Sequence, residues 1–154
     1  KSYCKTASLI ANSARAAGVL SDCSPTELDG LYRFGRQLGL AFQVVDDILD
    51  FTGSDQQLGK PAASDLASGY LTAPTFYAME EHPGLQALIS REFAEPGDLD
   101  DALEMVRSSR AIARTRELAE TFASESRDSI GWMKDSASKR ALLELPDFVL
   151  SRLY

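Results

Sequence analysis

The sequence predicts an all-α protein, and three observations support this. Apolar residues recur mostly at intervals of three and four, which is the spacing of one helix face. Residues that start and stop helices, mainly Ser, Pro and Gly, divide the chain into segments of helical length. No stretch of useful length alternates polar and apolar residues as a half-buried strand does. We therefore expect a bundle of helices packed antiparallel through short connections.

The first two expected helices have clear boundaries. Residues 3–18 carry apolar residues at helical spacing, and Gly18 is expected to end that helix. Ser24 is a natural N-cap because Pro25 follows at the first helical position. Glu27 stands where a capping box places its acidic residue. A long helix should run from there to about residue 51.

The polar segment 52–70 is rich in Gly, Ser and Asp, and a loop of this length is usually functional. Asp98 is expected to cap the helix that follows it, and Pro146 should kink or restart the last helix. The remaining expected helices cover residues 74–81, 85–93, 99–133 (one long or broken helix) and 137–152.

Composition excludes several classes of protein. The 154 residues are 44% hydrophobic and 25% charged, which is normal for a single globular domain. A formal charge of −7 argues against binding to nucleic acid, which generally needs a basic face. No apolar run approaches the roughly 18 to 20 residues that span a bilayer. Cys4 and Cys23 are expected to be reduced thiols, because two cysteines provide no disulfide framework at this size.

The segment "GLAFQVVDDILDFTG" (39–53) carries the main candidate site. Gln43, Asp46, Asp47 and Asp50 fall on one face of the expected helix, among apolar residues. Like charges three and four residues apart repel one another, and burial makes that repulsion more costly. Either this face is exposed to solvent, or a cation neutralises it. Mg²⁺ fits the second possibility because it takes one or two carboxylates together with water and substrate phosphates.

The residues around this segment lengthen the pattern. The matching stretches are "KTA" (5–7), "FQVVDDILD" (42–50), "GKP" (59–61), "DL" (65–66) and "LTAP" (71–74). Together they resemble the trans-type polyprenyl diphosphate synthases, most closely the long-chain, solanesyl-type enzymes. The resemblance implies that residues 1–154 are the C-terminal half of a single polyprenyl synthase domain of the isoprenoid synthase fold. The chain starts without methionine, which also suggests a piece of a longer protein.

The resemblance implies an enzyme that joins isopentenyl diphosphate to an allylic diphosphate in repeated trans condensations. It makes Asp46 a direct Mg²⁺ ligand, with Mn²⁺ as a possible substitute. Asp47 and Asp50 would hold metal-bound waters, although Asp50 could instead pair with Lys60. Lys5 and Lys60 would contact the allylic diphosphate, with Thr6 and Gln43 near the reacting carbons.

The sequence departs from the family pattern in two places. Tyr70 stands where many members carry a lysine. The first aspartate-rich motif and the residues that bind isopentenyl diphosphate are not in this chain, so the chain alone should not complete a turnover. The acidic group Asp98, Asp100 and Asp101 is expected to cap a helix and complement its dipole rather than to bind metal.

A non-catalytic regulatory subunit of a heteromeric synthase is the main alternative, but such subunits usually lose the aspartates and lysines that are intact here. A terpene cyclase and a purely structural helical domain are the others. The resemblance further implies a homodimer with no transmembrane segment, a hydrophobic product that favours membrane proximity, and a plastid or cytoplasmic location, with plastid favoured. Product length cannot be read from this sequence.

Overall fold

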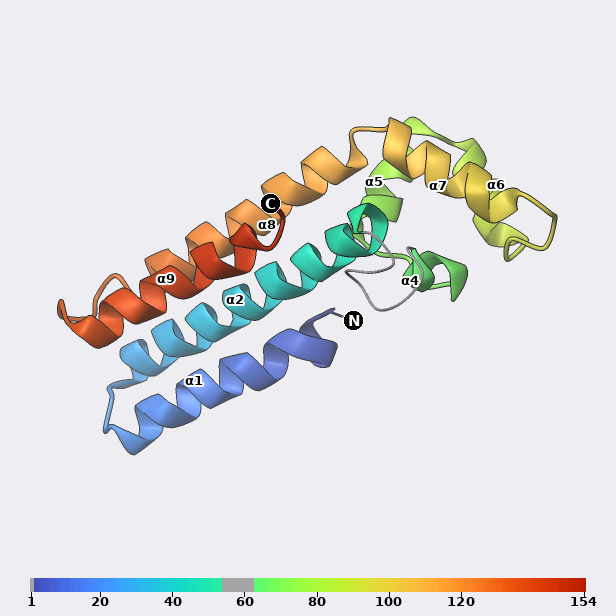
Figure 1. Cartoon of the computed structure of the whole chain (residues 1–154). Coiled ribbons are helices and arrows are strands. Elements are labelled where there is room, and N and C mark those ends of the chain that lie inside the picture. Colours follow the sequence, from blue (N-terminus) through green and yellow to red (C-terminus); the bar gives the residue numbers. More distant parts are fainter. Residues whose placement is uncertain (1, 54–62) are drawn as a thin grey trace. The chain divides into compact units, whose positions relative to one another are not determined.

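The computed structural model describes residues 2–53 and 63–154. These residues form helices and connecting turns, with no strand among them (Figure 1). The elements in chain order are η1 Tyr3–Ala7, α1 Ser8–Leu20, α2 Pro25–Thr52, α4 Ser64–Ala67, α5 Ala73–Glu81, α6 Gly84–Ser90, α7 Asp98–Ser108, α8 Ala111–Ser129 and α9 Ala137–Ser151. The prediction of an all-α protein is therefore confirmed.

The chain forms two compact units. The first contains Lys1–Val45 and Leu118–Tyr154, and the second contains Asp46–Glu117. Helices α2 and α8 each contribute residues to both units. No helix in the described ranges combines the length and the apolarity that crossing a membrane requires.

In the first unit, α1 runs back along the first part of α2 (Figure 1). Two glycines of α2 allow this close approach. A Cβ built on Gly39 would lie 2.5 Å from the Cα of Ala7, and one on Gly35 would lie 2.6 Å from the carbonyl oxygen of Ile10. Both obstacles are backbone atoms, so any side chain larger than glycine's hydrogen would push the helices apart.

The same unit also packs the last two helices against α2. The Ser126 hydroxyl of α8 donates to the Phe34 carbonyl of α2 at 3.1 Å and is fully buried. From α9 the Lys139 ammonium donates to the carbonyl of Met133 at 2.7 Å, which ties α9 to the turn after α8. Gly35 and Gly39 of α2 face Ile10 and Ala7, so these helices are antiparallel (Figure 1). Gly30 and Phe34 of α2 contact Ser129 and Ser126 of α8, so that pair is antiparallel as well.

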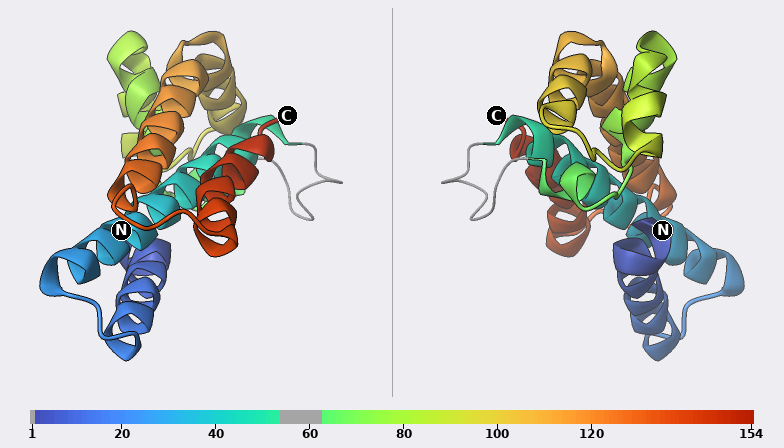
Figure 2. Two further views of the ribbon diagram at one scale, coloured as in Figure 1. Left: turned by 90° about the vertical axis from the view of Figure 1, so that its left-hand side faces the viewer. Right: turned by 90° about the vertical axis from the view of Figure 1, so that its right-hand side faces the viewer.

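The second unit has its own core. Its helices α5, α6 and α7 contact one another and stand as one group in both views of Figure 2. Apolar side chains from α2, α4, α5, α6, α7 and α8 fill the space between them. The buried members of this core are Phe51, Ala63, Leu66, Ala78, Leu85, Leu88, Ala102, Val106 and Ala111.

The capping box at the start of α2 is confirmed. The Ser24 backbone N–H donates to the Glu27 carboxylate at 2.7 Å, and the Glu27 N–H lies 3.4 Å from the Ser24 hydroxyl. The bond from the Ser24 N–H, followed by that from its hydroxyl, lowers the pKa of Glu27. We expect Ser24→Ala to destabilise the chain by about 1 kcal/mol, measured by urea unfolding at pH 7. An unchanged unfolding midpoint would contradict this role.

The structure differs from the expected elements at several points. Gly18 does not end the first helix, which continues to Leu20; it is instead a packing residue facing Leu28 and Leu31. The first five residues of that helix form a π-helical turn, η1, in which the Ser8 N–H bonds the Tyr3 carbonyl. The predicted loop 52–70 contains the short helix α4.

Pro146 was expected to kink or restart the last helix, but α9 does not restart there. The helix continues from Ala137 to Ser151 with Pro146 buried inside it. Burial of the proline ring within the first unit offsets the loss of the hydrogen bond that proline cannot donate.

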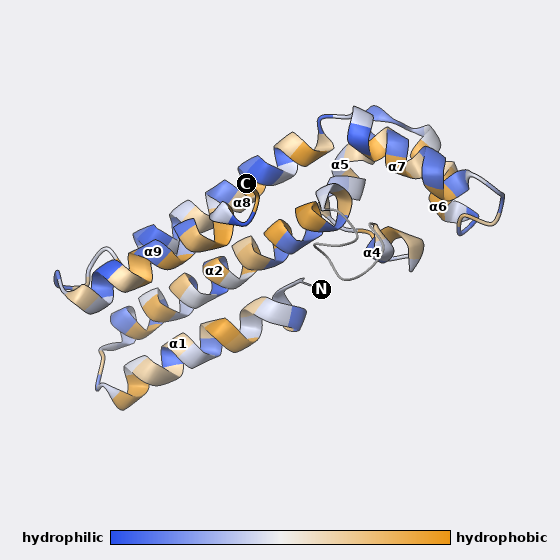
Figure 3. Cartoon of the chain, in the orientation of Figure 1, coloured by the Kyte–Doolittle hydropathy of each residue, from blue (hydrophilic) through white to orange (hydrophobic). Residues whose placement is uncertain are grey.

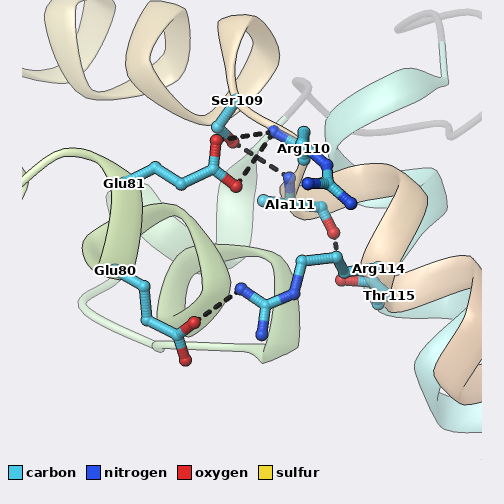
Figure 4. Close-up of polar contacts among 7 residues, drawn as sticks. All are labelled: Glu80, Glu81, Ser109, Arg110, Ala111, Arg114 and Thr115. Atoms are coloured by element: carbon cyan, nitrogen blue, oxygen red, sulfur yellow. Dashed lines mark hydrogen bonds and ion pairs between the residues drawn. The ribbon is translucent and has the colours of Figure 1, made fainter.

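The expected helix over 99–133 is broken between α7 and α8 (Figure 4). At the break, the Glu81 carboxylate of α5 accepts the Arg110 backbone N–H at 3.2 Å, and the Ser109 hydroxyl accepts that of Ala111 at 3.1 Å. One turn later, Arg114 pairs with Glu80 at 2.5 Å and lies 4.1 Å from the centre of the Tyr77 ring. Side chains from α5 thus cap and hold the start of α8.

Asp98 does not cap α7 as predicted. Gly97, with a φ of 94°, is the N-cap residue, and Asp98 is the first residue of the helix. The buried Asp98 carboxylate accepts the Arg91 Nε–H at 2.7 Å, a second bond from the same guanidinium, and the Glu95 N–H at 3.1 Å. Asp98 therefore ties the loop before α7 to the end of α6.

This bond predicts a dependence of stability on pH. Chiefly because Arg91 bonds its charged form, the pKa of Asp98 is lowered. A carboxyl whose pKa is lower in the folded state stabilises that state above its unfolded pKa of about 4, and this contribution is lost as pH falls through the folded value. Asp98→Asn should therefore be less stable than the parent chain at pH 6, with the difference shrinking toward pH 3. Urea unfolding at pH 6 and pH 3 checks this, and an equal difference in stability at both pH values would contradict it.

Candidate functional site

The three aspartates of the candidate site lie on the last two turns of α2, within the second unit. Asp47 and Asp50 are buried, with 5% and 2% of their surface exposed, and Asp46 is partly buried. Their helix neighbours Ile48 and Phe51 belong to the core, and Figure 3 shows polar residues among apolar ones along this helix. The possibility that these carboxylates form a solvated face is therefore excluded for Asp47 and Asp50.

Asp50 is bonded to the start of α4. The Ser64 hydroxyl donates to its Oδ1 at 3.1 Å, and the Asp65 backbone N–H donates to its Oδ2 at 3.2 Å. In addition, the Ala63 N–H donates to the Asp50 main-chain carbonyl at 2.6 Å. Sequence reasoning gave Ser64 no role. Its position just before "DL", at the first residue of a helix, is the signal that could have found it.

Thr6 and Gln43 come together in the first unit, as predicted for neighbouring polar groups. The Thr6 hydroxyl donates to Gln43 Oε1 at 2.9 Å, and Gln43 is 4% exposed. The contact depends on η1 packing against α2 where Gly39 meets Ala7. Lys5 precedes Thr6 on η1 and is exposed, so its ammonium is available to an anion.

The side chain of Phe42, next to Gln43, contacts a residue near the C-terminus. The guanidinium of Arg152, which follows α9, lies 4.6 Å from the centre of the Phe42 ring. A cation over an aromatic face at this distance is attractive. Sequence reasoning did not identify Arg152, because it lies 110 positions after Phe42 and no local pattern marks the pair.

The donor set suits a hard cation that shares its ligands with a substrate. Within the described ranges, no three His, Cys, Asp or Glu side chains lie close enough together to hold an ion unaided. Mg²⁺ does not require such a cage, since one or two carboxylates, waters and phosphate oxygens complete its octahedron. Asp46 and Asp47 can supply those carboxylates. Lys60 lies outside the described residues.

Known proteins that are similar to this chain point to one family. Residues 1–106 match the family model described as "Polyprenyl synthetase". The chain is 57% identical over 154 residues to a prenyl transferase of Synechocystis sp., covering 100% of this chain and 48% of that protein. It is 46% identical over 153 residues to the chloroplastic solanesyl diphosphate synthase 2 of Arabidopsis thaliana, covering 99% of this chain and 37% of that protein.

A solved structure agrees as well. The polyprenyl synthase from Caulobacter crescentus, complexed with calcium and isoprenyl diphosphate, superimposes with a TM-score of 0.86 and 32% identity, covering 97% of this chain and 47% of that one. The chain spans about half the length, or less, of the curated relatives it matches. The family match, residues 1–106, covers more than half of the chain and includes all seven predicted site residues. The chain therefore belongs to the polyprenyl synthetase family.

Proposed function

We propose that this chain is part of a long-chain polyprenyl diphosphate synthase that uses Mg²⁺ to condense isopentenyl diphosphate with an allylic diphosphate. The observation that carries the proposal is the burial of Asp47 and Asp50 on an apolar helix inside the segment that matches the family. Two carboxylates three residues apart on one helix suit a Mg²⁺ ion that shares its remaining positions with water and substrate phosphates. The Caulobacter relative, solved with calcium and isoprenyl diphosphate, supports a divalent cation and a diphosphate here.

In the proposed reaction the allylic C–O bond breaks, and its electron pair leaves with pyrophosphate. The double bond of isopentenyl diphosphate then forms the new C–C bond to the allylic cation, and loss of a proton restores a double bond. Bound Mg²⁺ would offset the charge that develops on pyrophosphate. Lys5 would add a second positive charge to the same group, and Lys60 is predicted to do so as well.

The remaining described residues would orient substrate and exclude water. The Thr6–Gln43 bond fixes the side-chain amide of Gln43, which would then face the substrate in one orientation. Buried apolar residues of α2, including Val45 and Ile48, would keep water from the cation. Asp46 and Asp47 would hold the cation and its waters.

Three further features belong to the same proposal. The Arabidopsis relative is a solanesyl diphosphate synthase, which supports a long-chain product. It is also chloroplastic, which supports a plastid location. Mn²⁺ is expected to replace Mg²⁺, since it accepts the same oxygen ligands. A homodimer is also proposed, and large exposed apolar side chains such as Leu20 and Phe148 are available for such a contact.

The test is a thermal-unfolding experiment on this chain. It measures ligand binding rather than turnover, because the chain spans about half the length of its relatives. Pyrophosphate with Mg²⁺ should raise the melting temperature, while either component alone should have a much smaller effect. Ligand at about 100 times its dissociation constant stabilises the folded state by roughly 2.7 kcal/mol. No shift with both components present would contradict the proposal. A shift of equal size with pyrophosphate alone would argue against the metal.

A further inference from the structure

The carboxylate of Asp50 is held by both of its oxygens. Ser64 Oγ donates to Oδ1 at 3.1 Å and the Asp65 N–H donates to Oδ2 at 3.2 Å, in a side chain that is 2% exposed. Because a donor binds each of the two oxygens, the bonds fix the plane of the carboxylate.

The backbone around Ser64 is shaped to make this contact. Ala63 is buried and adopts a left-handed conformation with a φ of 55°, which is uncommon for a residue with a side chain. In that conformation its N–H reaches the Asp50 carbonyl at 2.6 Å, and the next two residues present a hydroxyl and an N–H to the Asp50 carboxylate. Residues 63–65 thus bond the end of α2 at three points.

The geometry points to Ser64 as a positioning residue for the cation site, acting through Asp50. This inference rests on the proposed function, in which Asp50 holds metal-bound water. Residues that orient a metal-binding carboxylate often change metal affinity by about 10- to 100-fold when they are replaced. Ser64 donates through its side chain and Asp65 through its backbone, so a substitution of Ser64 removes a donor without altering the backbone.

The test measures Mn²⁺ binding to this chain in the presence of pyrophosphate, using the electron paramagnetic resonance signal of free Mn²⁺. Ser64→Ala should weaken Mn²⁺ binding by about 10-fold or more. Ser64→Thr keeps the hydroxyl and should bind within about threefold of the parent chain. Ser68→Ala removes a hydroxyl from the other end of α4 and should bind as the parent does.

The conservative variant separates positioning from a purely structural role. If Ser64→Ala binds Mn²⁺ as tightly as the parent, or if Ser64→Thr is as weak as Ser64→Ala, the inference is wrong while the proposed function stands. If the parent chain binds no Mn²⁺ with pyrophosphate, the proposed function fails and the inference fails with it. Amide exchange at Asp65 in metal-free protein should be faster in Ser64→Ala than in Ser68→Ala, and equal rates would also overturn the inference.

Discussion

Asp46→Asn and Asp47→Asn are each expected to remove most of the stabilisation that Mg²⁺ and pyrophosphate together give the chain. Asparagine keeps the size of the side chain but removes the negative charge that attracts the cation. The dissociation constant for Mg²⁺ in the presence of pyrophosphate should rise by at least about 10-fold, as for other residues that act on a bound metal. Calorimetric titration measures that constant directly.

The matched control is Asp100→Asn, which removes the same charge from an exposed residue in the first turn of α7. That variant should bind Mg²⁺ and pyrophosphate as the parent chain does. Each variant is compared with its own metal-free melting temperature, so that a change in folding is not mistaken for a change in binding. Equal weakening by Asp100→Asn and Asp46→Asn would mean that overall charge, rather than this site, governs binding.

Gly39→Ala is expected to have the largest effect on the fold of the first unit. Its Cβ would lie 2.5 Å from the Cα and 2.9 Å from the Cβ of Ala7, so the backbone of η1 must move away from α2. Overpacking of this kind costs about 1–3 kcal/mol. The movement should also lengthen or break the 2.9 Å bond between Thr6 and Gln43, which urea unfolding and the amide-proton signals of Gln43 can follow.

Gly84→Ala provides the comparison. A Cβ at Gly84 would meet only the terminal carbon of Met105, at 3.7 Å, which is ordinary contact distance. That variant should be neutral, or more stable by up to about 1 kcal/mol, because alanine loses less conformational freedom on folding. If both glycine variants were equally stable, close helix approach at Gly39 would not be the reason for its presence.

Local signals in the sequence predict most of the helices. The capping box at Ser24 and Glu27 uses residues three positions apart, so the sequence alone contains both partners. The end of α5 at His82 likewise follows from the adjacent proline and glycine. At these two boundaries, which depend on neighbouring residues in the chain, the prediction and the structure agree.

The wrong boundaries depend on distant residues. Glycine often ends a helix, but Gly18 packs against Leu28 and Leu31, and no local pattern reveals that contact. The break before α8 uses Glu81, about 30 residues earlier. Arg114 likewise bonds Glu80 of α5, 34 residues earlier, because the two helices meet in the folded unit.

In the candidate site too, local spacing predicts some features, while contacts between distant residues determine others. Spacing places Gln43 and the aspartates on one helix, which the structure confirms, and the structure decides between the two alternatives by burying Asp47 and Asp50. Ser64 was not assigned although it directly precedes "DL", because its bond to Asp50 spans 14 residues and requires the left-handed turn at Ala63. The roles of Lys5 and Lys60 toward a diphosphate stay predictions.

A crystal structure of the chain grown with Mn²⁺ and pyrophosphate, with anomalous diffraction to locate manganese, tests the metal site most directly. The account predicts an anomalous peak next to the carboxylate of Asp46, with phosphate oxygens among the manganese ligands. Manganese bound only at the acidic start of α7, or none near α2 while pyrophosphate is present, would contradict it.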